Sequence, residues 1–148
     1  MNQLNPVRVL FVGGDYPYLL YLKDLLSPEK SYGLFELYSA ENEAAAQPHL
    51  EKSKIDIVLI DISHAAVGLV PYERLHERFS DTPKLVLIEV NDEPLALEAI
   101  KKGAKGHLLK IRSERSPLPQ TIMQIVRQRQ EETAIRRNEE LFRTLIEN

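Results

Sequence analysis

Short apolar segments alternate with amphipathic segments along most of this 148-residue chain. Each apolar segment is followed by polar and apolar positions in helical spacing, and the apolar segments cover residues 8–12, 35–39, 57–61, 85–88 and 107–109. Five successive strand–helix units of this kind predict a parallel sheet covered by helices on both faces. We therefore expect an α/β domain built on a doubly wound, five-stranded parallel sheet.

Turn and capping residues set the expected limits of the helices. Pro71 opens a helix over residues 71–79. Asp92 can cap a helix that reaches residue 102, where Gly103 favours a left-handed ending. Further helices are expected over residues 16–26 and from just after Ala40 to about residue 52.

The last part of the chain predicts an unusually long helix. No Gly or Pro interrupts residues 120–148, and an apolar stripe returns after a polar stretch at residues 127–132. The stripe comprises Ala134, Ile135, Leu141, Phe142, Leu145 and Ile146. Its spacing favours a parallel coiled coil with a second copy, or a connector to another domain, over a helix folded back on its own domain. We expect a domain over residues 1–129 and a helical linker over residues 130–148.

Composition excludes several classes of function. A net charge of −3 gives no basic excess for neutralising nucleic-acid phosphates, so direct DNA or RNA binding is not expected. The chain has no cysteine, which excludes disulfides and thiolate metal sites. No apolar run approaches the length of a membrane span, and the N-terminus lacks the pattern of a signal peptide. We expect a cytoplasmic protein that does not enter membranes.

Chemically useful residues follow the ends of the predicted strands. Asp61 ends the most apolar run of the chain, Lys110 follows the last strand, and Asp15 lies just after the first. The carboxyl ends of parallel strands meet at one edge, where ligands bind in open α/β sheets. An isolated Asp–Lys pair is often a plain ion pair, but its place at this edge favours a functional site.

Residues 8–12, 56–61 and 99–104, together with Lys110, resemble the receiver domain of two-component response regulators. The resemblance covers residues 7–129 and implies the flavodoxin-like (βα)5 fold. It also implies that Asp61 is the phosphoacceptor and that Lys110 binds a phosphoryl oxygen. The implied partner is a sensor histidine kinase or phosphotransfer protein, and the implied role is regulatory, not enzymatic.

The chain departs from this family where the family holds Mg²⁺. Receiver domains normally carry two adjacent acids after the first strand, and here those positions are Gly13 and Gly14. Asp15 and Asp61 are the carboxylates left to hold a cation, and Asp15 is also suited to capping the following helix. We expect Mg²⁺ binding to be weak or absent in this degenerate acidic pocket.

Two further departures affect the positions that report phosphorylation in the family. Ile88, followed by Glu89, stands where receiver domains have Thr or Ser, and His107 replaces an aromatic residue in the last strand. Ile88 cannot donate a hydrogen bond, and Glu89 would repel a phosphoryl group. His107 could act as a smaller switch or a pH-sensitive group, although a lone His is more often a surface residue.

Three functions stay open at this point. Asp61 is a working phosphoacceptor, or the chain is a pseudo-receiver that acts through dimerisation and protein contacts. The third is a flavodoxin-like nucleotide or flavin binder that uses the Gly13–Gly14 turn, although no complete Gly-x-Gly-x-x-Gly pattern supports it. Residues 139–148 resemble the helix that leads into PAS-type sensor domains, which implies that this chain is part of a longer signalling protein.

Overall fold

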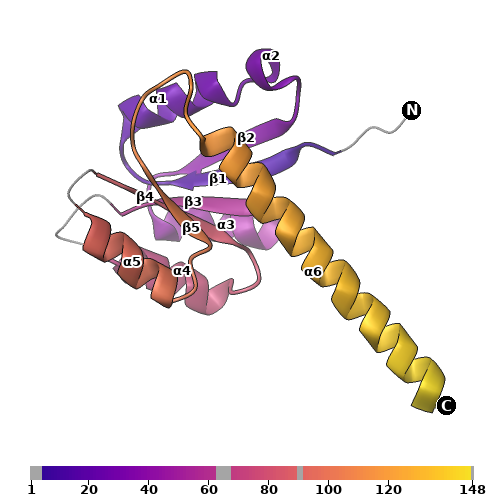
Figure 1. Cartoon of the computed structure of the whole chain (residues 1–148). Helices are drawn as coiled ribbons and strands as arrows, with labels where there is room; N and C mark the ends of the chain where they lie inside the picture. Colours follow the sequence, from indigo (N-terminus) through magenta and orange to yellow (C-terminus); the bar gives the residue numbers. More distant parts are fainter. Residues whose placement is uncertain (1–4, 63–67, 90–91, 148) are drawn as a thin grey trace.

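The sheet has the predicted composition and direction. The computed structural model describes residues 5–62, 68–89 and 92–147. Its five strands are all parallel and lie in the order β2-β1-β3-β4-β5 (Figure 1). They are β1 (Val7–Val12), β2 (Phe35–Ala40), β3 (Ile57–Asp61), β4 (Lys84–Ile88) and β5 (Gly106–Leu109). The expected doubly wound α/β fold is therefore confirmed.

Helices cover both faces of this sheet. They are α1 (Tyr16–Leu25), α2 (Pro28–Ser31), α3 (Glu43–Lys52), α4 (Val70–Arg78), α5 (Glu93–Lys101) and α6 (Leu118–Glu147). Side chains of α1 and the start of α6 pack in one hydrophobic cluster, and those of α3, α4 and α5 pack in the other. Residues 57–60 of β3 lie between the two clusters and are fully buried. A strand covered on both faces needs a continuous apolar sequence, which is what residues 57–60 supply.

Most of the predicted helix ends are correct, and two details differ. Gly103 follows α5 with a φ of 111°, the left-handed geometry expected of a glycine at this place. Asp92 does occupy the N-cap position of α5, but its side chain makes no capping hydrogen bond. The short helix α2 was not predicted; Ser27 caps it by accepting a hydrogen bond from the Lys30 amide.

The long helix α6 begins in the core and then leaves the body of the domain. Leu118 and Ile122 are buried against the sheet, whereas no described side chain from residue 127 to residue 146 is buried. The apolar stripe is open to solvent, with Phe142 65% and Leu145 78% exposed. Figure 1 shows α6 extending past the sheet, so the alternative of a helix folded back on its own domain is wrong for the described residues. None of the helices within those residues combines the length and the apolar character needed to span a membrane.

Candidate functional site

The ammonium group of Lys110 contacts carboxylates from three other segments at the carboxyl edge of the sheet. Its Nζ atom lies 2.6 Å from Asp15 Oδ2 and 2.8 Å from Asp61 Oδ2. Glu89 Oε1 lies further away, at 3.6 Å. Asp15 follows β1, Asp61 ends β3 and Glu89 follows β4, so the parallel topology brings these groups together as predicted. We call Lys110, Asp15, Asp61 and Glu89 the carboxyl-edge cluster.

Burial separates the members of this cluster. The side chains of Lys110 and Asp61 are only 5% and 2% exposed, whereas Asp15 is 25% and Glu89 57% exposed. Lys110 and Asp61 therefore form a buried ion pair, and Glu89 interacts with it from solvent. Removing one partner of a buried pair leaves the other charge uncompensated, which typically costs about 3–5 kcal/mol. The pair is thus expected to affect the stability of this edge as well as being a candidate site.

The charges of the cluster stabilise one another. The hydrogen bond from Lys110 is the main reason that the pKa of Asp15 lies below its ordinary value. Burial is the largest single influence on Lys110 and acts to lower its pKa, but the hydrogen bonds to Asp15 and Asp61 together hold that pKa above its ordinary value. Both groups are consequently charged at neutral pH.

Asp15 has a second role that the sequence predicted. Its Oδ1 atom accepts a hydrogen bond of 3.1 Å from the Tyr18 amide and so caps α1. This cap fixes the position of Tyr18, whose ring centroid lies 5.4 Å from the Lys110 ammonium. Sequence reasoning missed Tyr18, although an aromatic residue three positions after a capping Asp at a predicted site is a usable signal. The ring adds a cation–π contact to the cluster.

The two glycines after β1 differ in the room around them. A Cβ atom at Gly13 would lie 2.8 Å from Asp61 Cβ, so only glycine fits without displacing Asp61. A Cβ atom at Gly14 would meet nothing within 4 Å. Both glycines border a hollow of about 210 Å³ beside Asp61. That volume is below the roughly 300–1,000 Å³ of typical small-molecule sites, so the hollow does not favour the binding of a flavin-sized ligand.

The side chains at this edge do not fit a magnesium site. Mg²⁺ requires near-octahedral oxygen ligands, with one or two carboxylates that are available to it. Asp15 and Asp61 both direct an oxygen to Lys110, and Gly13 and Gly14 offer no side chain. Across residues 5–62, 68–89 and 92–147, no group of three His, Asp or Glu side chains is arranged to hold a metal ion. The ammonium group occupies the position between the carboxylates where a cation would be needed.

The structure places the three predicted switch positions in different environments. Ile88 is fully buried as the last residue of β4, and its carbonyl accepts a 2.9 Å hydrogen bond from the Lys110 amide. Glu89 lies at the cluster, as its position in the sequence predicted. His107 is exposed on β5, which matches the surface role and not an inward-pointing switch.

A second ionisable group was missed because it lies at the opposite, amino edge of the sheet. Lys84 is the first residue of β4 and is fully buried. Its Nζ atom donates to the Phe79 carbonyl and lies 3.3 Å from His76 Nδ1. The strand was expected over residues 85–88, so its start was placed one residue too late. The available signal was Pro83, which marks where the chain enters the strand.

Comparison with known proteins gives regulatory proteins as relatives. No family model matches the sequence. The chain is 33% identical over 90 residues to transcriptional regulatory protein YdfI of Bacillus subtilis, covering 60% of this chain and 41% of that protein. It is 34% identical over 74 residues to oxygen regulatory protein NreC of Staphylococcus epidermidis, covering 49% of this chain and 34% of that protein. The matches thus span less than half the length of either curated relative.

Solved receiver domains share the fold. A CheY-like response regulator receiver domain protein from Methanospirillum hungatei superimposes with a TM-score of 0.71 at 19% identity, covering 86% of this chain and 98% of that chain. The signal receiver domain of an HD domain-containing protein from Pseudomonas fluorescens gives 0.74 at 21% identity, covering 90% and 96%. At these identities the likeness establishes the fold. The predicted flavodoxin-like (βα)5 fold with an extended C-terminal helix is confirmed.

Proposed function

We propose that this chain is a signal-receiving regulatory domain of a longer signalling protein, with Asp61 as its phosphoacceptor. The observation that carries the proposal is the buried pair of Asp61 and Lys110 at the carboxyl edge of a receiver-type fold. Over the matched segments, about a third of the residues are identical to those of two regulatory proteins, and this likeness supports a regulatory role. The proposed phosphodonor is a sensor histidine kinase or phosphotransfer protein.

The proposed reaction moves a phosphoryl group to the Asp61 carboxylate. A carboxylate oxygen of Asp61 attacks the phosphorus of a phosphohistidine while the phosphorus–nitrogen bond breaks, and its electron pair stays on the imidazole, which takes up a proton. An aspartyl phosphate results. Lys110, 2.8 Å from Asp61 Oδ2, is positioned to neutralise charge on the phosphoryl oxygens.

This reaction is expected to be slow. Phosphoryl transfer depends on cations that neutralise the developing charge. Among the described residues of the carboxyl-edge cluster, Lys110 is the one cation. Lys110 would have to break its hydrogen bond to Asp15 to bind a phosphoryl oxygen. The Glu89 side chain would have to rotate away from the added negative charge. Glu89 can do so because its side chain is 57% exposed.

A route from the cluster to α6 runs through two tyrosines. Tyr18 lies over Lys110, and its ring centroid is 5.4 Å from that of Tyr21. The Tyr21 hydroxyl donates a 2.5 Å hydrogen bond to the Ser113 carbonyl, in the segment between Lys110 and α6. A change at Lys110 can therefore reach the start of α6 through packed groups. We propose that the output is the pairing of α6 with a second copy and the transmission of this state to a further domain of PAS type.

One observation favours a second candidate, a pseudo-receiver whose cluster is static. Lys110 already holds both Asp15 and Asp61, and the glycines leave the carboxylates without the neighbours that would recruit Mg²⁺. In that case the domain acts through protein contacts, with α6 as the dimerisation element, and Asp61 is never phosphorylated.

Acetyl phosphate separates the two candidates. The full chain is incubated with it, and intact masses are compared between wild type and Asp61→Asn, which preserves shape and removes the nucleophile. A slow phosphoryl adduct that is absent from the variant is expected. With a competent receiver domain modified in parallel, an unmodified wild-type chain would refute phosphorylation by small phosphodonors and favour the pseudo-receiver.

A further inference from the structure

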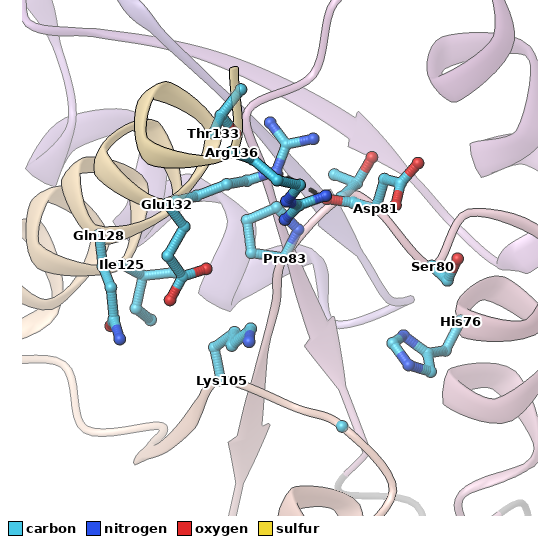
Figure 2. Close-up of a pocket in the computed structure, with 13 residues that line it drawn as sticks. His76, Ser80, Asp81, Pro83, Lys105, Ile125, Gln128, Glu132, Thr133 and Arg136 are labelled. Carbon is cyan, nitrogen blue, oxygen red and sulfur yellow. Dashed lines mark hydrogen bonds between the residues drawn. The ribbon is translucent and has the colours of Figure 1, made fainter. Parts of the chain in front are cut away.

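An open cavity of about 430 Å³ lies where α6 leaves the body of the domain. The end of α4, the segments that enter β4 and β5, and the middle of α6 form its walls (Figure 2). It lies at the amino edge of the sheet, and the length of β4 separates it from the carboxyl-edge cluster by roughly 13 Å. The cavity therefore cannot be part of the Asp61 site.

Charged side chains line this cavity without pairing. Lys105 comes from the segment before β5, and Arg129 and Arg136 come from α6. The acids that line the cavity are Asp81, from the segment before β4, and Glu132, from α6. No two of these five side chains form an ion pair within 4 Å; the bond that joins the walls runs from Arg129 Nε to the Asp81 carbonyl, 2.7 Å. Figure 2 shows Glu132 extending from α6 on the side where Lys105 lies. We call this group the α6 joint.

Opposite charges elsewhere on the protein do form ion pairs. Arg74 lies 2.7 Å from Glu43, and Arg78 lies 2.8 Å from Glu51. Both of these pairs join neighbouring helices, so the fold readily allows such contacts. The separation of charges at the α6 joint is a local feature of that cavity.

Positive charge predominates at the joint. Three cationic side chains and two carboxylates line the cavity, and the buried Lys84 ammonium lies 3.3 Å from Nδ1 of His76, which also lines it. Burial lowers the pKa of Lys84 to about 8, and Arg129 pushes in the same direction while Asp81 opposes it. Burial and then the nearby Lys84 and Lys105 charges lower the pKa of His76. These groups repel one another, and an added anion would relieve that repulsion.

We infer that the α6 joint binds a small molecule bearing a phosphate or pyrophosphate group. Arg129 and Arg136 offer planar guanidinium groups that suit phosphate oxygens, and Lys105 faces them from the body of the domain. The volume lies within the range of small-molecule sites and exceeds the needs of a simple ion. An occupant contacts both α6 and the body, so it fixes the direction in which α6 leaves. The joint thereby gives the output helix a second input that does not require phosphorylation of Asp61.

Calorimetric titration of the full chain with sodium pyrophosphate at constant ionic strength tests this inference. Saturable binding is expected. Lys105→Gln and Arg136→Gln should each weaken it about tenfold or more, since each removes a charge-assisted contact. Lys101→Gln on α5 and Arg137→Gln on α6 are matched controls, because both are exposed and lie outside the cavity lining; they should change affinity by less than about twofold. All four positions are exposed, so folding should be preserved, which circular dichroism checks.

Three results would overturn the inference. The first is a titration without a saturable heat of binding. The second is a loss of affinity in the control variants equal to that in Lys105→Gln and Arg136→Gln, which indicates general charge screening. The third is clearly tighter binding in Asp61→Asn, because that variant frees Lys110 for an anion and the result would place the pyrophosphate at the carboxyl-edge cluster. Failure of the phosphoacceptor proposal changes none of these expectations.

The effect on α6 has its own measurement. The chain has no cysteine, so spin labels at Lys52→Cys on α3 and Glu140→Cys on α6 can be attached selectively. Pyrophosphate should narrow the distance distribution between the labels. An unchanged distribution at saturating pyrophosphate would contradict the proposed control of α6.

Discussion

The two edges of the sheet hold similar charged groups in opposite arrangements. At the carboxyl edge, Lys110 is buried and closes onto Asp15 and Asp61 at 2.6 and 2.8 Å. At the amino edge, the lysine, arginines and acids of the α6 joint surround an open cavity and do not pair. The charges of the carboxyl edge are therefore paired within the fold, whereas the charges of the α6 joint are not paired with one another.

The difference follows from what lies around each group. Strand ends and the capped α1 enclose the carboxyl-edge cluster, and water is largely excluded from Lys110 and Asp61. The α6 joint lies between the body and a helix that leaves it, so solvent reaches its charges. Charges in solvent do not need partners, and charges in the interior do. Stability is thus expected to depend strongly on the first set and weakly on the second.

The largest effect is predicted for Lys110→Met. The variant leaves Asp61 buried without its cation, so the free energy of unfolding should fall by about 3–5 kcal/mol in urea denaturation. The double variant Lys110→Met/Asp61→Asn removes both charges and should recover much of this loss. If the free energy of unfolding of the single variant falls by less than about 1 kcal/mol, the pair is not the buried unit described above.

Substitutions at the two glycines test how tightly Asp61 is packed. Gly13→Ala places a Cβ atom 2.8 Å from Asp61 Cβ, so the free energy of unfolding should fall by about 1–3 kcal/mol. Gly14→Ala meets open space and should change stability by less than about 1 kcal/mol. Equal effects of the two variants in thermal unfolding would contradict the close approach at Gly13.

Lys84 makes the stability of the amino edge depend on pH. Its pKa is about 8 in the folded state and 10.5 ordinarily, so between these values the unfolded chain binds more protons. Stability should therefore rise as the pH increases from about 8 to about 10, by about 1–3 kcal/mol. Urea denaturation should show this rise in wild type and in the exposed control Lys101→Met, but not in Lys84→Met. A rise that persists in Lys84→Met would assign it to another group.

The smallest effect on stability is predicted for removal of the exposed part of α6. Ending the chain after Arg129 removes no buried side chain among the described residues 130–146, so the free energy of unfolding should change by less than about 0.5 kcal/mol. Sedimentation analysis should nevertheless show weaker self-association, because Ile135, Phe142 and Leu145 are lost. Equal association with and without this segment would contradict the coiled coil.

The sequence predicted the sheet well because its strands are buried. Residues 57–60 and 85–88 are fully buried, and burial on both faces leaves an unmistakable apolar run. Lys84 escaped detection because one cationic residue interrupts that pattern at a strand end. The helix α2 was missed because four residues give no hydrophobic period, and its cap, Ser27, resembles an ordinary turn residue.

The candidate site was predictable to the extent that topology alone assembles it. Asp15, Asp61, Glu89 and Lys110 follow strands whose ends must meet in a parallel sheet, and they do meet. Tyr18 was also within reach of the sequence, because the predicted cap at Asp15 positions it next to Lys110. The α6 joint was not predictable, because it depends on where α6 crosses the amino edge, and that crossing is set by tertiary packing of Ile122, Ile125 and Val126.

The most direct test of the account is the magnesium dependence of Asp61 phosphorylation in wild type and Gly14→Asp. The added carboxylate has room at Gly14, so it can supply an oxygen ligand that wild type lacks. We predict that wild type is modified slowly and at the same rate with Mg²⁺ or with a chelator, and that Gly14→Asp is accelerated about tenfold or more by Mg²⁺ alone. A comparable acceleration of wild type by Mg²⁺ would contradict the account, because it would show that Asp15 and Asp61 hold the metal ion despite Lys110.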